Sequence, residues 1–208
     1  MMWRILPWLL AIPLCGEIVD RVAVSFGTEV ITASELDERI RLTAFQNRTT
    51  PVFNPANRKQ AAEQLIDQRF VMREMQLGHY SALAEADAAV LLANYVKATY
   101  PQPADFPKAL ADAGLKPSQL QADLARQADL LTFLNLRFRP AVQVTEEDIR
   151  KYYSDRVDQK TAYNDVRSVI EEALTAARAD QELDLWLKDQ RRRVKIEYHP
   201  EAFGGKVP

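Results

Sequence analysis

Residues 21–46 read RVAVSFGTEVITASELDERIRLTAFQ. Apolar and polar residues alternate over 21–32 on either side of Gly27, a pattern that is typical of a short β-hairpin. Two capping-box spacings, which favour the start of a helix, follow directly: Thr32 with Glu35, and Ser34 with Asp37. The stretch therefore predicts two short strands that lead into a helix ending near Gln46.

Downstream of this stretch, apolar residues recur at helical spacing and are interrupted by proline and glycine. Residues 49–57, TTPVFNPAN, predict a loop. We expect helices over residues 56–77, 84–99, 105–113, 117–139 and 163–193, with another that starts at Thr145. VKIEY at 194–198 alternates again and predicts a closing strand, which we expect to pair with the hairpin. The expected fold is mainly α with a small β-sheet.

The apolar stripes of three predicted helices indicate which of their faces are buried. The helix at 56–77 is apolar over much of its circumference, which is typical of a central helix. Its stripe is Ala62, Leu65, Ile66, Phe70 and Leu77, widened by Val71, Met72 and Met75. The two later stripes are Leu120, Leu124, Ala128, Leu131, Leu134 and Phe138, and Val169, Ala173, Ala176, Leu183, Leu187 and Val194.

The composition excludes several classes of function. The 208 residues include 27 basic and 29 acidic side chains, and this near balance gives no electrostatic case for nucleic-acid binding. Six glycines form neither a dinucleotide-binding motif nor a phosphate-binding loop. Two histidines and one cysteine cannot build a zinc site of the usual spacing. We therefore expect no metal and no cofactor.

The first 16 residues, MMWRILPWLLAIPLCG, are typical of a secretory signal peptide. Arg4 precedes an apolar run over residues 5–14, which is shorter than the roughly 20 residues that a membrane-spanning helix needs. Cleavage near residues 15–17 would leave a mature chain without cysteine, which suits an oxidising compartment. Lipidation of Cys15 is the alternative, although Leu14 is bulky for such a signal. We expect a periplasmic or otherwise exported protein.

The residues that could suggest catalysis have simpler explanations. His79 follows Gly78 at a predicted helix end, where an imidazolium would interact favourably with the helix dipole. Charged groups at other helix ends fit the same dipole: Glu146, Glu147 and Asp148 at a start, and Arg191, Arg192 and Arg193 at an end. No serine lies in a G-x-S-x-G motif. The sequence therefore predicts no catalytic residue.

The order of these segments resembles a known family. The similar stretches are DRVAV at 20–24, VITASEL at 30–36, QLIDQRF at 64–70, VTEEDIRKYY at 144–153, LWLK at 185–188 and VKIEY at 194–198. Together they resemble the SurA-type periplasmic chaperones, whose N-terminal peptide-binding domain is trigger-factor-like. The resemblance implies a helical chaperone domain over residues 17–153 that is completed by a C-terminal helix and strand over 163–198, followed by a tail at 199–208.

The same resemblance implies that one part of the family's architecture is missing. In that family a parvulin-type prolyl isomerase domain follows the helix at 144–153, but here only a linker at 154–162 stands in its place. A domain needs about 50 residues or more. The paired histidines, the glycine-glycine-aspartate turn and the phenylalanine-lined proline pocket of parvulins are also absent. The pair Gly204-Gly205 is followed by lysine rather than aspartate. We therefore expect a chaperone module without enzymatic activity.

The expected function is the binding of unfolded or nascent exported polypeptides, including outer-membrane clients, in a groove between helices. Large apolar surfaces recognise such clients without sequence-specific hydrogen bonds. The candidate binding residues are Phe53, Met72, Met75, Tyr95, Tyr100 and Phe106. Two alternatives stay open: an assembly adaptor that docks one fixed partner, and a protein that belongs to a prolyl isomerase family in name only. A homodimer is also left open.

Overall fold

The computed structural model describes residues 20–81, 85–158 and 161–204, and the predicted signal peptide lies outside them. The fold is mainly α with one small antiparallel sheet, as the sequence predicts. Its strands and helices are, in order, β1 (Val22–Phe26), β2 (Glu29–Thr32), α1 (Ala33–Gln46), α2 (Pro55–Leu77), α3 (Glu85–Thr99), α4 (Phe106–Asp112), α5 (Pro117–Arg137), α6 (Glu146–Arg156), α7 (Tyr163–Arg193) and β3 (Ile196–Tyr198). Single 3-10 turns are η1 (Pro103–Asp105), η2 (Arg139–Ala141) and η3 (Pro200–Phe203).

The sheet has the strand order β2-β1-β3, so the last strand of the chain pairs with the first. Val24 lies opposite Tyr198, and Phe26 lies opposite Ile196, in an antiparallel ladder. Gly27 turns the β1–β2 hairpin with a φ of +56°, a conformation that glycine adopts without steric cost. The prediction that the closing strand joins the hairpin is confirmed.

The start of α1 uses the first of the two predicted capping boxes. The Thr32 side chain accepts from the backbone N–H of Glu35, and the Glu35 carboxylate accepts from the Thr32 N–H at 2.9 Å. Ser34 instead donates its hydroxyl to Asp20. The hairpin is thereby joined to α1 without a loop, which fixes the first helix against the sheet.

The main core lies between the sheet, α1, α2 and η3. Phe26 and Phe70 meet edge to face with ring centroids 5.5 Å apart. Ala202 and Phe203 of η3 are also buried in this core. The prediction of a tail at 199–208 is therefore wrong for η3, because the turn brings an aromatic side chain back under the sheet; residues 205–208 lie outside the described part of the chain.

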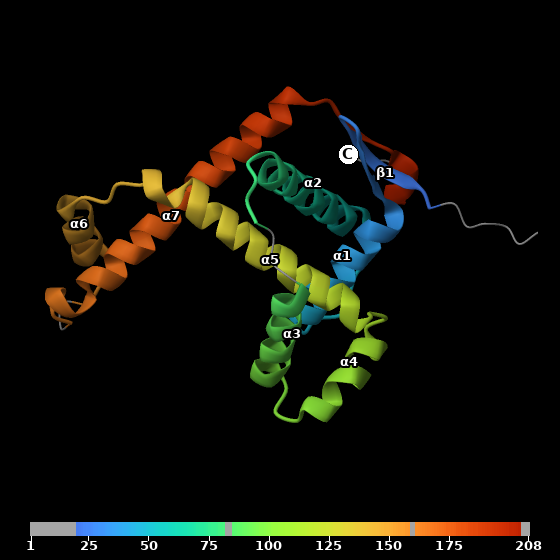
Figure 1. Ribbon diagram of the computed structural model, residues 1–208, viewed down its shortest axis with the longest axis horizontal. Coiled ribbons are helices and arrows are strands. Elements are labelled where there is room, and N and C mark those ends of the chain that lie inside the picture. Colours follow the sequence, from blue (N-terminus) through green and yellow to red (C-terminus); the bar gives the residue numbers. More distant parts are fainter. Residues whose placement is uncertain (1–19, 82–84, 159–160, 205–208) are drawn as a thin grey trace, which may run out of the picture.

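A second, smaller core holds α3 and α4 against the first half of α5 and the end of α1. Figure 1 shows this lobe below α5, on the opposite side from α7. Its fully buried or nearly buried members are Leu42, Phe106, Leu110, Leu115 and Leu120. Gly114, with φ of +67°, ends the turn after α4, as the sequence predicts.

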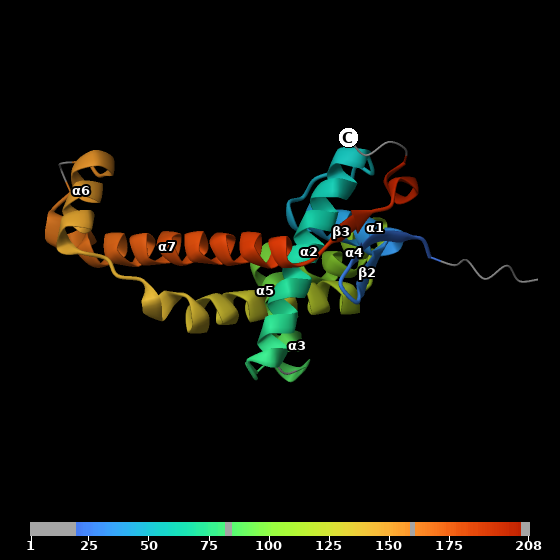
Figure 2. The ribbon, with the colours of Figure 1, turned by 90° about the horizontal axis from the view of Figure 1, so that it is seen from above.

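An arm extends from the core and is formed by the first half of α7 with α6 packed at its end (Figures 1 and 2). Helix α7 has 31 residues, and at 1.5 Å per residue it is about 46 Å long. Arg178 on α7 pairs with Asp148 on α6 at 2.9 Å, and Arg139 of η2 pairs with Glu172. Helix α6 continues to Arg156, so the predicted linker at 154–162 is wrong at its start.

The predicted stripes are correct in part. Leu77, Leu131 and Val169 are exposed, whereas Phe133, Ile170 and Ala179 are buried. The reason lies in the tertiary structure. Helix α5 packs on α3 in its first half and on α2 and α7 in its second, so its buried face changes direction along the helix, and α7 runs beyond the core into the arm.

Candidate functional site

A groove opens where α2, α5 and α7 meet. Figure 1 shows α2 lying between the ribbons of α5 and α7. Its cavity volume is about 400 Å³. The lining comes from four helices: Arg39 and Thr43 of α1; Gln64, Asp67, Gln68, Val71, Met72 and Met75 of α2; Arg126, Gln127, Asp129 and Leu130 of α5; and Leu183 and Leu187 of α7. We name this hollow the α2–α5–α7 groove.

The base of the groove is apolar and firmly packed. Val71, Met75 and Phe133 are buried together beneath it, and Trp186 and Leu187 of α7 pack against them. The Phe133 ring meets Trp186 at 5.5 Å between centroids. Three helices thus pack around one phenylalanine beneath the groove.

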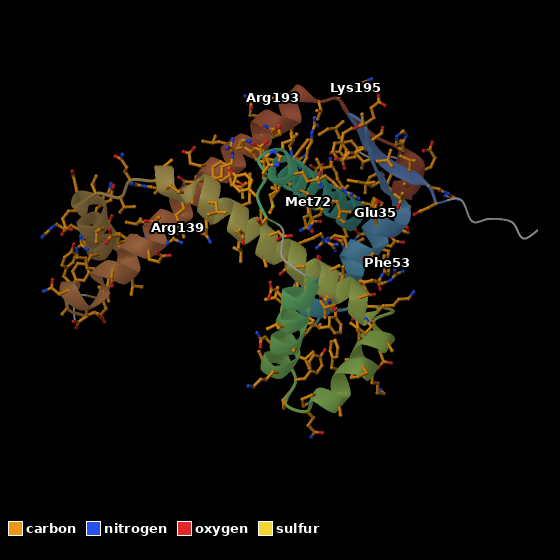
Figure 3. The ribbon with its side chains drawn as sticks, viewed as in Figure 1. Glu35, Phe53, Met72, Arg139, Arg193 and Lys195 are labelled. Atoms are coloured by element: carbon orange, nitrogen blue, oxygen red, sulfur yellow. The ribbon has the colours of Figure 1, made fainter. Side chains whose placement is uncertain are left out.

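Two apolar side chains stand at the groove surface and remain accessible. Met72 is 36% exposed and Leu130 is 38% exposed. Figure 3 shows Met72 on the side of α2 that faces α5. Methionine is flexible and polarizable, so it adapts to ligands of different shape. Met72 and Leu130 therefore give the groove an accessible apolar surface above a buried apolar base.

A buried ionic cluster forms the α1 side of the groove. The Asp123 carboxylate is fully buried; its Oδ1 lies 2.8 Å from Arg39 Nη1 and 3.5 Å from Arg126 Nη2. Its Oδ2 accepts hydrogen bonds from Gln46 at 3.1 Å and Gln127 at 2.8 Å. A buried carboxylate is costly unless charges and donors surround it. The cluster joins α1 to α5 and carries two guanidinium groups for one carboxylate.

A smaller hollow continues the groove past this cluster. Its volume is about 130 Å³, and it shares Arg39, Gln68, Met72 and Arg126 with the α2–α5–α7 groove. Glutamine side chains have both donors and acceptors, as does a peptide backbone. The two hollows therefore lie next to each other, and both present glutamine side chains at their surface.

The α7 side of the groove is held by a second ionic cluster. Arg191 Nε and Nη2 lie 2.9 Å and 2.6 Å from Asp67 Oδ1, and Arg191 also pairs with Glu63. Burial raises the pKa of Asp67, which Arg191 partly offsets. Arg191 therefore does more than complement the dipole of α7, the role expected from the sequence: it fastens α7 to α2.

The structure does not bring the six predicted binding residues together. Met72 and Met75 line the groove, the second of them from a buried position. Tyr95, Tyr100 and Phe106 instead belong to the second core, where Tyr100 and Phe106 meet edge to face at 5.5 Å. These three complete a core because α3 and α4 fold onto α5.

Phe53 occupies a third place. It lies in the loop between α1 and α2, partly exposed, and the Arg41 guanidinium stands 5.2 Å from its ring centroid. It is not among the residues of the groove. Phe53 is thus accessible but separate from Met72.

Some groove residues were not predicted as binding residues. Leu183 and Leu187 belong to a predicted apolar stripe, so the sequence contained a signal for them. Leu130 lies off the predicted stripe of its helix, and the buried charge of Asp123 has no sequence signal. The positions of Leu130 and Asp123 depend on which helices pack against each part of α5, and only the tertiary structure shows this.

Over residues 20–81, 85–158 and 161–204, no group of three or more His, Cys, Asp or Glu side chains is placed to hold a metal ion. Within the same ranges, no helix has the length and apolarity that crossing a membrane requires. Comparison with known proteins finds no matching family model and no matching curated protein.

Proposed function

We propose that this protein is an exported chaperone that holds apolar segments of unfolded polypeptides in the α2–α5–α7 groove, without catalysis. The observation that carries the proposal is the groove itself: accessible Met72 and Leu130 above a buried apolar base, with glutamines along its edge. The function needs no cofactor, because apolar burial supplies the binding free energy.

The chemistry of the lining suits an unfolded chain. Such a chain exposes apolar side chains, which the methionine and leucines can cover, and unpaired backbone groups, which Gln64 and Gln68 can bind. Ordering a flexible client costs free energy on binding. We therefore expect weak affinity, with a dissociation constant on the order of micromolar.

The architecture adds support from a different direction. The hairpin, the long α7 and the pairing of β3 with β1 correspond to what the resemblance to SurA-type chaperones implies. The segment between Arg156 and Tyr163 is too short for an isomerase domain. Export to the periplasm is part of the proposal and rests on the sequence of residues 1–16.

An assay with several clients separates a chaperone from an adaptor with one partner. The mature chain is added to several unrelated proteins as they are diluted from denaturant, and light scattering reports aggregation. A chaperone of the proposed kind reduces scattering for most of them at stoichiometric amounts. Protection of none of them, or of a single one, contradicts the proposal, and protection of a single one favours the adaptor.

A further inference from the structure

Residues 39–62 form the longest stretch of the chain without an acidic residue. They cover the second half of α1, the loop at residues 47–54 and the first third of α2. In a chain of net charge −2, this stretch has five basic side chains, which are Arg39, Arg41, Arg48, Arg58 and Lys59. Positive charge is therefore concentrated around the loop at 47–54, which we name the α1–α2 loop.

Two of these five cations are compensated by carboxylates. Arg39 pairs with Asp123 at 2.8 Å, and Arg58 pairs with Asp37 at 3.0 Å. The other three have no ion pair among the residues that the structure describes, and they are Arg41, Arg48 and Lys59. Uncompensated cations therefore lie before, within and after the α1–α2 loop.

The acidic residues next to this stretch do not offset its charge in full. Glu63, directly after it, is paired with Arg191. Asp112, on the neighbouring α4, pairs with a lysine of its own helix at 3.3 Å. Glu38, directly before the stretch, accepts a hydrogen bond from Gln119 at 2.7 Å. With Glu38 counted in full against the three free cations, a surplus of two positive charges remains at the loop.

The α1–α2 loop presents apolar side chains beside these cations. Val52 is 51% exposed and Phe53 is 39% exposed. The Arg41 guanidinium lies 5.2 Å from the Phe53 ring centroid, so one cation is directly beside the aromatic ring. Phe53 lines neither of the hollows described above. Figure 3 shows it on the side of the molecule away from the arm.

Hydrogen bonds tie the loop to the helices on both sides of it. Arg48 Nη2 donates to the Thr99 carbonyl at the end of α3, at 2.8 Å. Asn57 of α2 donates its side-chain amide to the Val52 carbonyl, also at 2.8 Å. The loop is thus anchored through its backbone and Arg48, while the side chains of Val52 and Phe53 remain accessible.

We infer that the α1–α2 loop docks the protein on membrane surfaces that contain anionic phospholipids. Val52 and Phe53 enter the interface, and Arg41, Arg48 and Lys59 pair with lipid phosphate groups. Cations around exposed apolar side chains are typical of proteins that bind the surface of a membrane. A lipid interface closes around a protruding side chain, whereas an acidic protein would need a hollow of matching shape, so the geometry favours lipid.

The inference goes beyond the proposed function and does not depend on it, because no residue of the α1–α2 loop lines the α2–α5–α7 groove. The test measures co-sedimentation with vesicles of phosphatidylcholine alone and with vesicles of an equimolar mixture of phosphatidylcholine and phosphatidylglycerol. Residues 1–16 are omitted because their apolar run would itself bind lipid, and every described strand and helix lies after them. The protein should bind the mixed vesicles more tightly, and salt should weaken this binding because it screens exposed charges.

Substitutions assign the binding to the loop. Lys59→Gln should lower the partition coefficient about fivefold, the contribution of one basic residue near an anionic surface. Phe53→Ser should also lower it by about fivefold, because less apolar surface enters the interface. Lys59→Arg keeps the charge and should retain the binding of the unaltered protein. Circular dichroism checks that each variant is folded.

The matched controls are Lys151→Gln and Tyr152→Ser on α6. Lys151 is exposed, and Tyr152 is 37% exposed, close to the value for Phe53. Figure 1 shows α6 at the end of the arm, far from the α1–α2 loop. Both controls should therefore bind the mixed vesicles as the unaltered protein does.

Four results would each overturn the inference and leave the proposed function intact. The first is equal sedimentation of the unaltered protein with the two kinds of vesicle. The second is a loss in Lys151→Gln as large as in Lys59→Gln, which would indicate attraction without a defined surface. The third is unchanged binding of Phe53→Ser. The fourth is binding of polyglutamate, dependent on Lys59, without binding of vesicles, which would assign the surface to an acidic protein.

Discussion

The phenol of Tyr198 on β3 donates a hydrogen bond to the Glu63 carboxylate on α2, at 2.6 Å, across 135 residues of chain. Arg191, at the end of α7, pairs with the same carboxylate and with Asp67. The contact fastens the C-terminal strand and helix to the central helix of the fold. It also fixes α7 as one wall of the α2–α5–α7 groove.

The Tyr198 contact predicts a loss of stability in alkali. Burial, with the hydrogen bond and charge of Glu63, raises the pKa of Tyr198 above its ordinary value of 10.0. Above pH 10 the unfolded state therefore ionises this phenol while the folded state keeps it protonated, so the free energy of unfolding falls as pH rises. In Tyr198→Phe this contribution is absent, and denaturant titrations should show a shallower decline above pH 10.

The control for this prediction is Tyr152→Phe, which alters an exposed tyrosine of α6. It should follow the unaltered protein at every pH. If Tyr198→Phe shows the same decline as the unaltered protein, Tyr198 does not control stability in alkali.

Phe203 should contribute strongly to the stability of the fold, although it lies near the end of the chain. It is fully buried and packs with Tyr198 and the sheet. Phe203→Ala should lower the free energy of unfolding by about 3–5 kcal/mol. Val169→Ala on the exposed face of α7 is the control and should change it by about 0.5 kcal/mol or less. A small effect of Phe203→Ala would show that η3 does not contribute to the core.

Local signals in the sequence predicted most elements of the fold. The Thr32 and Thr145 capping boxes and Pro117 mark helix starts that the structure confirms. Phe203 was missed because a short aromatic segment beside prolines and glycines resembles a tail, and only the sheet and α2 bury it. Pairing of β3 with β1 was predictable because an isolated hairpin needs a third strand.

The groove was less predictable than the fold. Met72 and Met75 were predicted to bind clients because methionine suits adaptable surfaces; both line the groove, and their binding role stays a prediction. Tyr100 and Phe106 lie in the second core instead. The sequence does not show this, because an aromatic residue near a proline-rich turn has the same pattern whether a neighbouring helix covers it or not. Which face of α5 meets α2, and hence Leu130, depends on contacts between distant segments.

Removal of the C-terminal part should unfold the domain rather than shorten it. Deleting residues 163–208 removes α7, β3 and η3, and with them the partners of β1, Glu63 and Phe133. We expect loss of the cooperative thermal transition and of much helical circular dichroism. A truncated protein with an unchanged melting temperature would contradict the arrangement described here.

We expect no prolyl isomerase activity from this protein. Uncatalysed isomerisation of X-Pro bonds takes tens to hundreds of seconds, so even weak catalysis is measurable with a proline-containing peptide. At every protein concentration, the isomerisation rate of the peptide should equal its uncatalysed rate in buffer. Acceleration that a point substitution removes would refute the non-enzymatic account.

The most direct test of the central claim compares two neighbouring leucines of α5. Leu130 lines the α2–α5–α7 groove, whereas Leu131 is 59% exposed and lies outside its lining. The measurement is the dissociation constant of a leucine-rich unfolded peptide by fluorescence anisotropy. Leu130→Gln should weaken binding about fivefold or more, since roughly 1 kcal/mol of apolar burial is lost, and Leu131→Gln should leave it unchanged. Equal affinities of both variants and the unaltered protein would contradict the claim that this groove binds clients.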